Sequence, residues 1–178
     1  AKENNKSVHF LGLVSDGGVH SHSSHLKYLI KTASDFGLKK LFVHAFTDGR
    51  DVDPKSGSKQ ISDLINYIKD YPAKLASLCG RYYAMDRDKR WERTKKAYDL
   101  IVNGIGNKST DIVKSIEQSY ENGITDEFIE PIIIHNNDNL KSSLINNEDV
   151  VIFFNFRTDR GRQLTEVLSQ NDLEEQSM

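Results

Sequence analysis

The arginines of this chain are grouped, whereas its lysines are spread along most of its length. An arginine side chain ends in a flat, rigid fork that binds a carboxylate or phosphate with two hydrogen bonds, which the lysine ammonium does not do. The grouping therefore predicts a surface that binds an oxyanion. The alternative is that some arginines pair with neighbouring acidic residues, and we favour it for three of them. The eight arginines are Arg50; Arg81, Arg87, Arg90 and Arg93; and Arg157, Arg160 and Arg162, and the three are Arg90, Arg93 and Arg162.

Four polar segments each follow a short apolar run that is typical of a strand. In open α/β sheets, ligands bind beyond the carboxyl ends of the strands. If the strands are parallel, these segments converge at one edge and bring together arginines, a histidine and several aspartates. The pattern predicts a site for a small ligand that carries more than one negative charge. The segments are SDGGVHSH (15–22), TDGRD (47–51), GRYYAMDRDKR (80–90) and NFRTDR (155–160).

Individual residues in these segments have more than one interpretation. Arg50 and Asp51 form either a turn salt bridge worth less than about 1 kcal/mol or an anion-binding cation beside a carboxylate that exchanges a proton with a substrate hydroxyl. His20 and His22 have the spacing of metal ligands, but no further ligand set is evident in the sequence. His20 could equally cap a helix. His44 lies in the middle of a predicted strand and is interpreted as a hydrogen-bonded core histidine.

The apolar residues alternate between strand-like runs and helical periodicity. This alternation predicts an α/β fold, a three-layer α/β/α arrangement with a mostly parallel sheet. The run at 150–154 is apolar throughout and predicts a central strand. Pro131 opens another run and predicts an edge strand at 132–134 because proline cannot donate to the ladder. The other expected strands are 8–14, 41–46 and 75–79, and the expected helices are 26–36, 61–68, 91–101 and 112–120 with a last one from 164.

Composition narrows the class of protein. The length of 178 residues fits one domain spanning 1–178. A net charge of −2 argues against a nucleic-acid partner, as do the acidic residues among the basic residues of 81–96. The apolar runs are too short to cross a bilayer, so no membrane partner is expected. Cys79 is the single cysteine, which excludes an internal disulfide and makes a cytoplasmic location the expectation. The Rossmann glycine fingerprint and the Walker A pattern are absent.

Longer segments resemble the signature segments of cofactor-independent phosphoglycerate mutases. The similarity extends from about residue 8 to the C-terminus, and the segments come in the order that the family has, at compatible spacing. Motifs of this length are specific. They are SDGGVHSH (15–22), DGRDV (48–52), GRYYAMDRDKRW (80–91), YENGITDEFIEP (120–131) and FNFRTDR (154–160).

The resemblance implies an isomerase of glycolysis and gluconeogenesis that interconverts 3-phosphoglycerate and 2-phosphoglycerate through a phosphoserine. In this family a phosphatase-like domain carries the serine and two divalent metal ions, usually manganese. A second domain, inserted into the first, holds the glycerate. This chain resembles the inserted substrate-binding (phosphotransferase) domain. We therefore expect no metal and no cofactor in it, no mutase activity from it alone, an exposed sheet edge, and the phosphatase-like domain as its partner in a longer protein.

The resemblance also assigns substrate contacts, position by position. Asp51 is the residue expected to handle protons on the glycerate hydroxyls. The carboxylate is assigned to Arg50, Arg157 and His20. The phosphoryl group is assigned to the remaining arginines of the set. The full set of expected contacts is His20, Arg50, Asp51, Arg81, Arg87, Arg157 and Arg160.

Three other functions fit parts of the sequence. The arginines could form an anion-binding module without a catalytic partner. His20 and His22 could belong to a metal-dependent hydrolase. The basic and aromatic residues of 81–96 could bind nucleic acid, in which case binding would depend steeply on salt.

Overall fold

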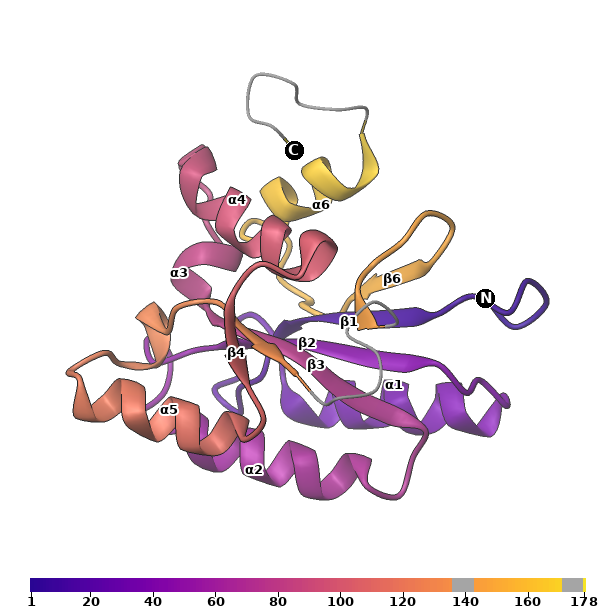
Figure 1. Ribbon diagram of the computed structural model, residues 1–178, viewed down its shortest axis with the longest axis horizontal. Helices are drawn as coiled ribbons and strands as arrows, with labels where there is room; N and C mark the ends of the chain where they lie inside the picture. Colours follow the sequence, from indigo (N-terminus) through magenta and orange to yellow (C-terminus); the bar gives the residue numbers. More distant parts are fainter. Residues whose placement is uncertain (136–142, 171–177) are drawn as a thin grey trace.

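The computed structural model describes residues 1–135, 143–170 and 178, and it has three layers. Figure 1 shows one sheet with α1, α2 and α5 on one face and α3, α4 and α6 on the other. The strands are β1 (Val8–Leu13), β2 (Leu41–Thr47), β3 (Ala73–Gly80), β4 (Asn107–Ser109), β5 (Ile132–Ile134) and β6 (Val150–Phe153). The helices are α1 (Ser23–Asp35), α2 (Gly57–Ile68), α3 (Arg81–Ala84), α4 (Trp91–Tyr98), α5 (Ile112–Glu121) and α6 (Arg162–Ser169). The predicted α/β fold is confirmed.

The sheet is mostly parallel. Its strand order is β4-β5-β3-β2-β1-β6. Strand β1 lies parallel to both β2 and β6, β2 is parallel to β3, and β4 is parallel to β5. Among the described strands, only the short pairing of β3 with β5 is antiparallel. Because β1, β2, β3 and β6 run the same way, their carboxyl ends lie along one edge of the sheet, where the polar segments begin.

Two strand predictions were wrong. Strand β5 is not an edge strand, because it lies between β4 and β3. Pro131 stands just before β5 and takes part through its carbonyl, which accepts the Asn107 N–H at 2.8 Å. Strand β6 is not central, because it pairs with β1 and ends the strand order among the described residues. Val150 and Val151 are each 37% exposed there, so the apolar run is not enclosed on both sides.

Each face of the sheet has its own apolar core. One contains Leu26 and Ile30 of α1, Ile61 and Leu64 of α2, and Ile116 of α5. The other contains side chains of α3, α4 and α6, together with those of the π-helical turn Asp99–Asn103 that extends α4. Alternate residues of β1 and β2 point into opposite cores, as the period of two in a strand requires. No helix of the described part of the chain is long and apolar enough to span a membrane.

A chain of buried polar side chains runs from strand to strand on the face of the sheet that carries the second core. His9 Nδ1 lies 2.9 Å from His44 Nε2, and His44 Nδ1 lies 2.8 Å from Ser77 Oγ. His9 Nε2 is 3.4 Å from a carboxylate oxygen of Asp149, which precedes β6. We call these four residues the histidine chain. The structure confirms that His44 is a hydrogen-bonded core residue. The role of His9 was not predicted from the sequence.

Candidate anion-binding site

The four polar segments meet at the carboxyl edge of the sheet. Three of them are joined through main-chain and side-chain contacts around His20. Its carbonyl accepts the N–H groups of Phe156 and Arg157 at 2.9 and 3.2 Å. A hollow of about 430 Å³ opens at this edge, and we call it the arginine hollow because six arginines line it. Its lining residues are Arg50, Arg81, Arg87, Arg90, Arg93 and Arg160, with Tyr82, Met85, Asp86, Asp88, Glu127 and Phe128.

Arg81 is the buried centre of the site. Its side chain is 3% exposed, and Nη1 donates to Asp48 Oδ1 at 2.7 Å and to Asp51 Oδ2 at 2.5 Å. Because Arg81 is the first residue of α3, directly after β3, the end of one strand brings it against the loop that follows its neighbour β2. Its bonds to the two carboxylates raise the pKa of Arg81 although burial opposes this. Arg81 therefore stays charged and fixes Asp51.

Asp48 organises the loop after β2 and was missed in the sequence, where Asp48-Gly49 looks like an ordinary turn. Its carboxylate is 1% exposed and accepts the Ser15 hydroxyl at 2.6 Å and the Arg50 and Asp51 N–H groups at 3.2 and 3.0 Å. Burial alone would raise the pKa of Asp48, but these hydrogen bonds and that of Arg81 hold it below its usual value. A buried carboxylate is thus kept ionised in order to shape the loop.

His20 faces Asp51 across the site. It is 3% exposed, its Nε2 lies 3.7 Å from Asp51 Oδ2, and its Nδ1 lies 4.0 Å from Asp159 Oδ1. Both separations exceed a hydrogen bond, and within the described residues Nδ1 has no hydrogen-bond partner. Burial, with Arg81 and Arg157 adding to it, lowers the pKa of His20. A neutral imidazole with an unused ring nitrogen is suited to hydrogen-bonding a ligand.

Asp159 forms ion pairs with Arg157 and Arg87, two of the predicted contact residues. Its role was also not predicted from the sequence. Arg157 donates two hydrogen bonds to the Asp159 carboxylate, from Nε to Oδ1 at 2.8 Å and from Nη2 to Oδ2 at 3.0 Å. Arg87 Nη1 donates to the same carboxylate at 3.0 Å. These side chains are about half exposed, so the pairs contribute little stability. Asp159 occupies the donor geometry that a carboxylate ligand would use.

The lining of the arginine hollow contains six arginines and three acidic residues, and Asp48, Asp51 and Asp159 pair with two of these arginines from outside the lining. Arg160 donates to the Met85 carbonyl at 3.2 Å. Its pKa is lowered by burial and then by the nearby cations Arg87, Arg81 and Arg50. Arg50 is itself 57% exposed and lies only 3.4 Å from the Glu127 carboxylate. Since these cations destabilise one another, an anion with several charges would relieve the repulsion by entering the hollow.

The structure brings all seven predicted contact residues together, although their roles toward a ligand stay predictions. Four of them line the hollow, Asp51 contacts Arg81, His20 faces Asp51, and Arg157 joins Arg87 through Asp159. Of the three arginines for which local pairing was favoured, Arg93 lies 3.6 Å from Asp86 and stacks 3.8 Å above the Tyr82 ring. The four that line the hollow are Arg50, Arg81, Arg87 and Arg160.

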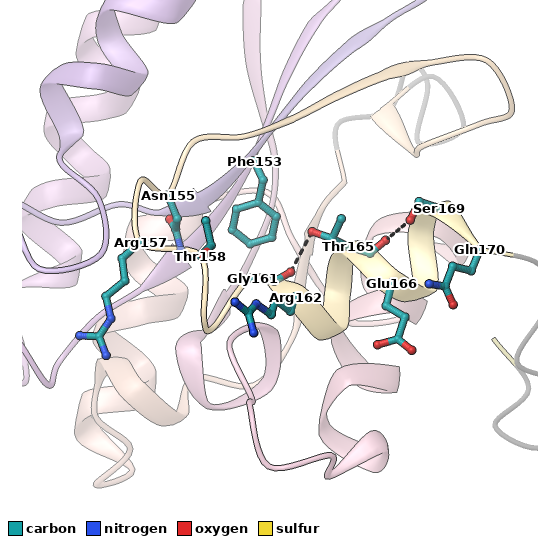
Figure 2. A pocket seen from close by; sticks show the side chains of 10 residues that line it. All are labelled: Phe153, Asn155, Arg157, Thr158, Gly161, Arg162, Thr165, Glu166, Ser169 and Gln170. Atoms are coloured by element: carbon teal, nitrogen blue, oxygen red, sulfur yellow. Dashed lines mark hydrogen bonds between the residues drawn. The ribbon is translucent and has the colours of Figure 1, made fainter.

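A second hollow, of about 490 Å³, lies between the end of β6 and α6. Figure 2 shows Phe153 at its centre and the guanidinium of Arg157 extending away from α6. The hydroxyls of Thr165 and Ser169 donate to carbonyls of the preceding helical turn at 2.8 and 2.7 Å. Its lining contains two arginines and the acidic Glu166, against six arginines in the arginine hollow, so it is the weaker candidate for an anion.

The two histidines with metal-ligand spacing do not form a metal cluster. His22 caps α1, where its Nδ1 accepts the Ser24 N–H at 3.2 Å. In the parts of the chain that the structure describes, no group of three or more His, Cys, Asp or Glu side chains could hold a metal ion. The hydrolase interpretation thus lacks a ligand set here.

Comparison with known proteins agrees with the geometry. A family model described as "BPG-independent PGAM N-terminus" matches residues 1–178. The chain is 66% identical over its full length to the 2,3-bisphosphoglycerate-independent phosphoglycerate mutase of Flavobacterium johnsoniae, and 54% identical to that of Bacteroides thetaiotaomicron. It covers 35% and 34% of these two relatives, or about a third of their length.

A solved structure shows the same architecture. The crystal structure of Leishmania mexicana phosphoglycerate mutase at low cobalt concentration superposes with a TM-score of 0.89 at 29% identity, over 94% of this chain and 32% of that one. The match of the family model from the first residue to the last shows that the chain belongs to the 2,3-bisphosphoglycerate-independent phosphoglycerate mutases and corresponds to the region named as their N-terminus.

Proposed function

We propose that this chain is the substrate-binding part of an enzyme that interconverts 3-phosphoglycerate and 2-phosphoglycerate. The observation that carries the proposal is the arginine hollow, in which six arginines gather at the carboxyl edge of a parallel sheet and the pKa of Arg160 is lowered by burial and by neighbouring arginines. A phosphoglycerate has a phosphoryl group and a carboxylate, so it presents anionic groups at two ends. Phosphoryl transfer depends on positioning and charge neutralisation more than on covalent chemistry from the protein.

The arginines divide by position. Arg81, Arg87 and Arg160 reach the hollow from α3 and from the loops before α4 and α6, and they are assigned to the phosphoryl group. The carboxylate is assigned to Arg50, Arg157 and His20. To bind this way, Arg157 exchanges Asp159 for the substrate carboxylate, which offers the same two acceptors.

Asp51 is assigned the transfer of the proton of the glycerate hydroxyl. A glycerate hydroxyl that attacks phosphorus loses its proton, and a carboxylate within hydrogen-bond reach can take it and later return it. Arg81 holds Asp51 Oδ2 in place, and the neutral His20 ring lies 3.7 Å from the same oxygen. A substrate hydroxyl that lies between the two side chains would contact both of them.

The metal ions that the family resemblance implies do not fit the described residues, because these contain no cluster of candidate ligands. We therefore assign the metals and the phosphorylated serine to the phosphatase-like part of a longer protein, and we derive no step through them. On this proposal, the chain alone binds substrate without a metal and does not interconvert the two phosphoglycerates.

The test is a calorimetric or NMR titration with 3-phosphoglycerate in the presence of a chelator. We expect weak binding with a Kd on the order of 1 mM, abolished in Arg157→Ala. Arg162→Ala is the matched control, because Arg162 is an exposed arginine outside the arginine hollow and should bind like wild type. By the intact protein we mean the longer protein that contains this chain and the phosphatase-like part. If the intact protein bound 3-phosphoglycerate but produced no 2-phosphoglycerate, the function would be that of an anion-binding module instead. Absence of binding by the intact protein would reject both.

A further inference from the structure

A buried carboxylate outside the arginine hollow ties together the segments that form it. Asp126 begins the 3-10 turn Asp126–Phe128, which we call the 126–128 turn, and it is 0% exposed. One carboxylate oxygen accepts the Tyr120 hydroxyl at the end of α5, and the other accepts the Gly57 N–H at 2.7 Å. The family resemblance assigned no role to either Tyr120 or Asp126.

The backbone of Asp126 fixes the same region. Its carbonyl accepts the Thr47 hydroxyl at 2.7 Å, and its N–H donates to the Pro54 carbonyl at 2.9 Å. Thr47 is the last residue of β2, while Pro54 and Gly57 lie before and at the start of α2. Asp126 therefore holds both ends of the loop that carries Arg50 and Asp51.

Three glycines show how closely the 126–128 turn packs. A Cβ on Gly49 would lie 2.8 Å from Asp126 Cβ, and one on Gly57 would lie 2.4 Å from Asp126 Oδ1. A Cβ on Gly80 would lie 2.2 Å from the Glu127 carbonyl oxygen, and the Gly80 N–H donates to the Ile129 carbonyl at 2.7 Å. Gly49 precedes Arg50 and Gly80 precedes Arg81. The turn is therefore in direct contact with the backbone that orients both arginines.

We propose that Tyr120 and Asp126 are positioning residues, which act through the 126–128 turn to hold Arg50, Asp51 and Arg81 in the geometry that binds substrate. The part that concerns substrate rests on the proposed function, whereas the holding of the loop does not. Binding sites of this kind lose activity steeply when their groups move, because a displacement of about 1 Å can cost about 100-fold in rate.

The chemistry of the pair explains why the phenol is needed. Burial, with Asp48 and Asp53 nearby, raises the pKa of Asp126, although Tyr120 and Gly57 oppose the rise. Burial and the bond to Asp126 raise the pKa of Tyr120, so the phenol keeps its proton and donates it. The Tyr120 oxygen also accepts the Ser58 N–H at 3.1 Å. Removing the hydroxyl leaves a buried carboxylate with one donor fewer and a helix N–H without its acceptor.

The test uses the intact protein with Tyr120→Phe and a matched control, Tyr67→Phe. Tyr67 also donates its hydroxyl to a carbonyl, that of Lys27 at 3.0 Å, but it lies at the far end of α2. In Tyr120→Phe we expect amide hydrogens in peptides covering 47–58 to exchange about tenfold faster. We also expect KM for 3-phosphoglycerate to rise about tenfold while kcat stays within about threefold. Tyr67→Phe should leave both at wild-type values.

Asp126→Asn keeps the shape and one acceptor, so its exchange rates and KM should lie between those of wild type and Tyr120→Phe; it also serves if Tyr120→Phe does not fold. Equal exchange of 47–58 and equal KM in the Tyr120→Phe and Tyr67→Phe proteins would overturn the inference. If wild type does not act on phosphoglycerates, the proposed function fails, and the exchange measurement, which needs no substrate, decides the positioning role by itself.

Discussion

The arginine hollow and the histidine chain are both networks of polar side chains in or beside the sheet, yet their charges differ. In the histidine chain, His9, His44 and Ser77 are almost fully buried, and both ring nitrogens of His44 have a hydrogen-bond partner, one on His9 and one on Ser77. Burial lowers the pKa of His9 and lowers that of His44 well below its usual value, so both rings are neutral. The hollow instead concentrates charged groups, and its arginines lower the pKa of Arg160.

This difference separates a structural network from the network that we propose binds substrate. A polar group inside a protein is stable when its partners are complete, as they are for the His44 ring. In the arginine hollow, Arg81 has its counter-ions in place, because the carboxylates of Asp48 and Asp51 both face its guanidinium. Burial and neighbouring arginines lower the pKa of Arg160, and we propose that an anionic ligand offsets this unfavourable interaction. The comparison predicts that substitutions in the two networks affect stability and binding in different proportions.

The largest effect is expected from Arg81→Met. Removing this guanidinium leaves Asp48, which is 1% exposed, without its counter-ion, and breaking a buried pair costs about 3–5 kcal/mol. Urea unfolding at pH 7 measures the loss. Arg162→Met is the control, an exposed arginine whose substitution should change stability by less than about 0.5 kcal/mol. A loss below that of an ordinary surface substitution would show that Arg81 is not the closed centre of the site.

The next largest effect is the loss of folding stability at acid pH. Both histidines of the histidine chain have folded-state pKa values below the unfolded value of 6.5, so the unfolded chain binds protons first as pH falls. Stability is therefore full above pH 6.5 and is lost below it, by about 1.4 kcal/mol per pH unit for each histidine that stays neutral. Urea midpoints between pH 7.5 and about 5 measure this slope. His44→Gln should reduce the slope, and an unchanged slope would assign the acid sensitivity elsewhere.

Arg160→Gln should separate binding from stability. Because other arginines disfavour its charge, neutralising this residue should leave the free energy of unfolding within about 0.5 kcal/mol of wild type. Its charge faces the hollow, so the affinity for 3-phosphoglycerate should fall about tenfold, which is about 1.4 kcal/mol. Paired unfolding and titration measurements test both. A variant that lost stability and kept its affinity would show that Arg160 has a structural role and not a role in binding.

The smallest effect is expected from Asp159→Asn. The exposed pairs of Asp159 with Arg157 and Arg87 contribute about 0–1 kcal/mol to stability, so unfolding should barely change. The internal competitor for these arginines is lost, and the affinity for 3-phosphoglycerate should rise about two- to threefold, or about 0.5 kcal/mol. Titration at low salt makes the change easiest to measure. Weaker binding would show that Asp159 orients the arginines instead of competing for them.

The sequence was sufficient for the α/β architecture and for the segments that meet at the carboxyl edge, because alternation of apolar patterns and strand direction determine both. It was insufficient for strand position. An all-apolar run looks the same at an edge as at the centre of a sheet, so the position of β6 was predicted wrongly. Pro131 suggested an edge strand at β5, although its carbonyl accepts a hydrogen bond from the N–H of Asn107 in β4.

Within the site, residues with a distinctive chemistry were found and those with an ordinary one were not. Arg81 and Asp51 stand in long motifs. Asp48 looks like a turn residue and Asp159 like a local ion-pair partner. Asp126 is 69 to 79 residues away in sequence from the two ends of the loop that it holds. The one signal for Asp126 was its place in the YENGITDEFIEP segment (120–131), which had no role attached.

The parallel pairing of β1 with β6 has a consequence for the order of folding. Val8 of β1 pairs with Val150 of β6, whereas the β1–β2 and β2–β3 pairs join consecutive strands. Contacts between distant parts of a chain form late, because a long loop must close first. On the ribosome, β1, β2 and β3 with α1 and α2 can assemble while β1 still has an open flank. The loop carrying Arg157 and Arg160 follows β6, so the anion site is among the last parts of the molecule to be completed.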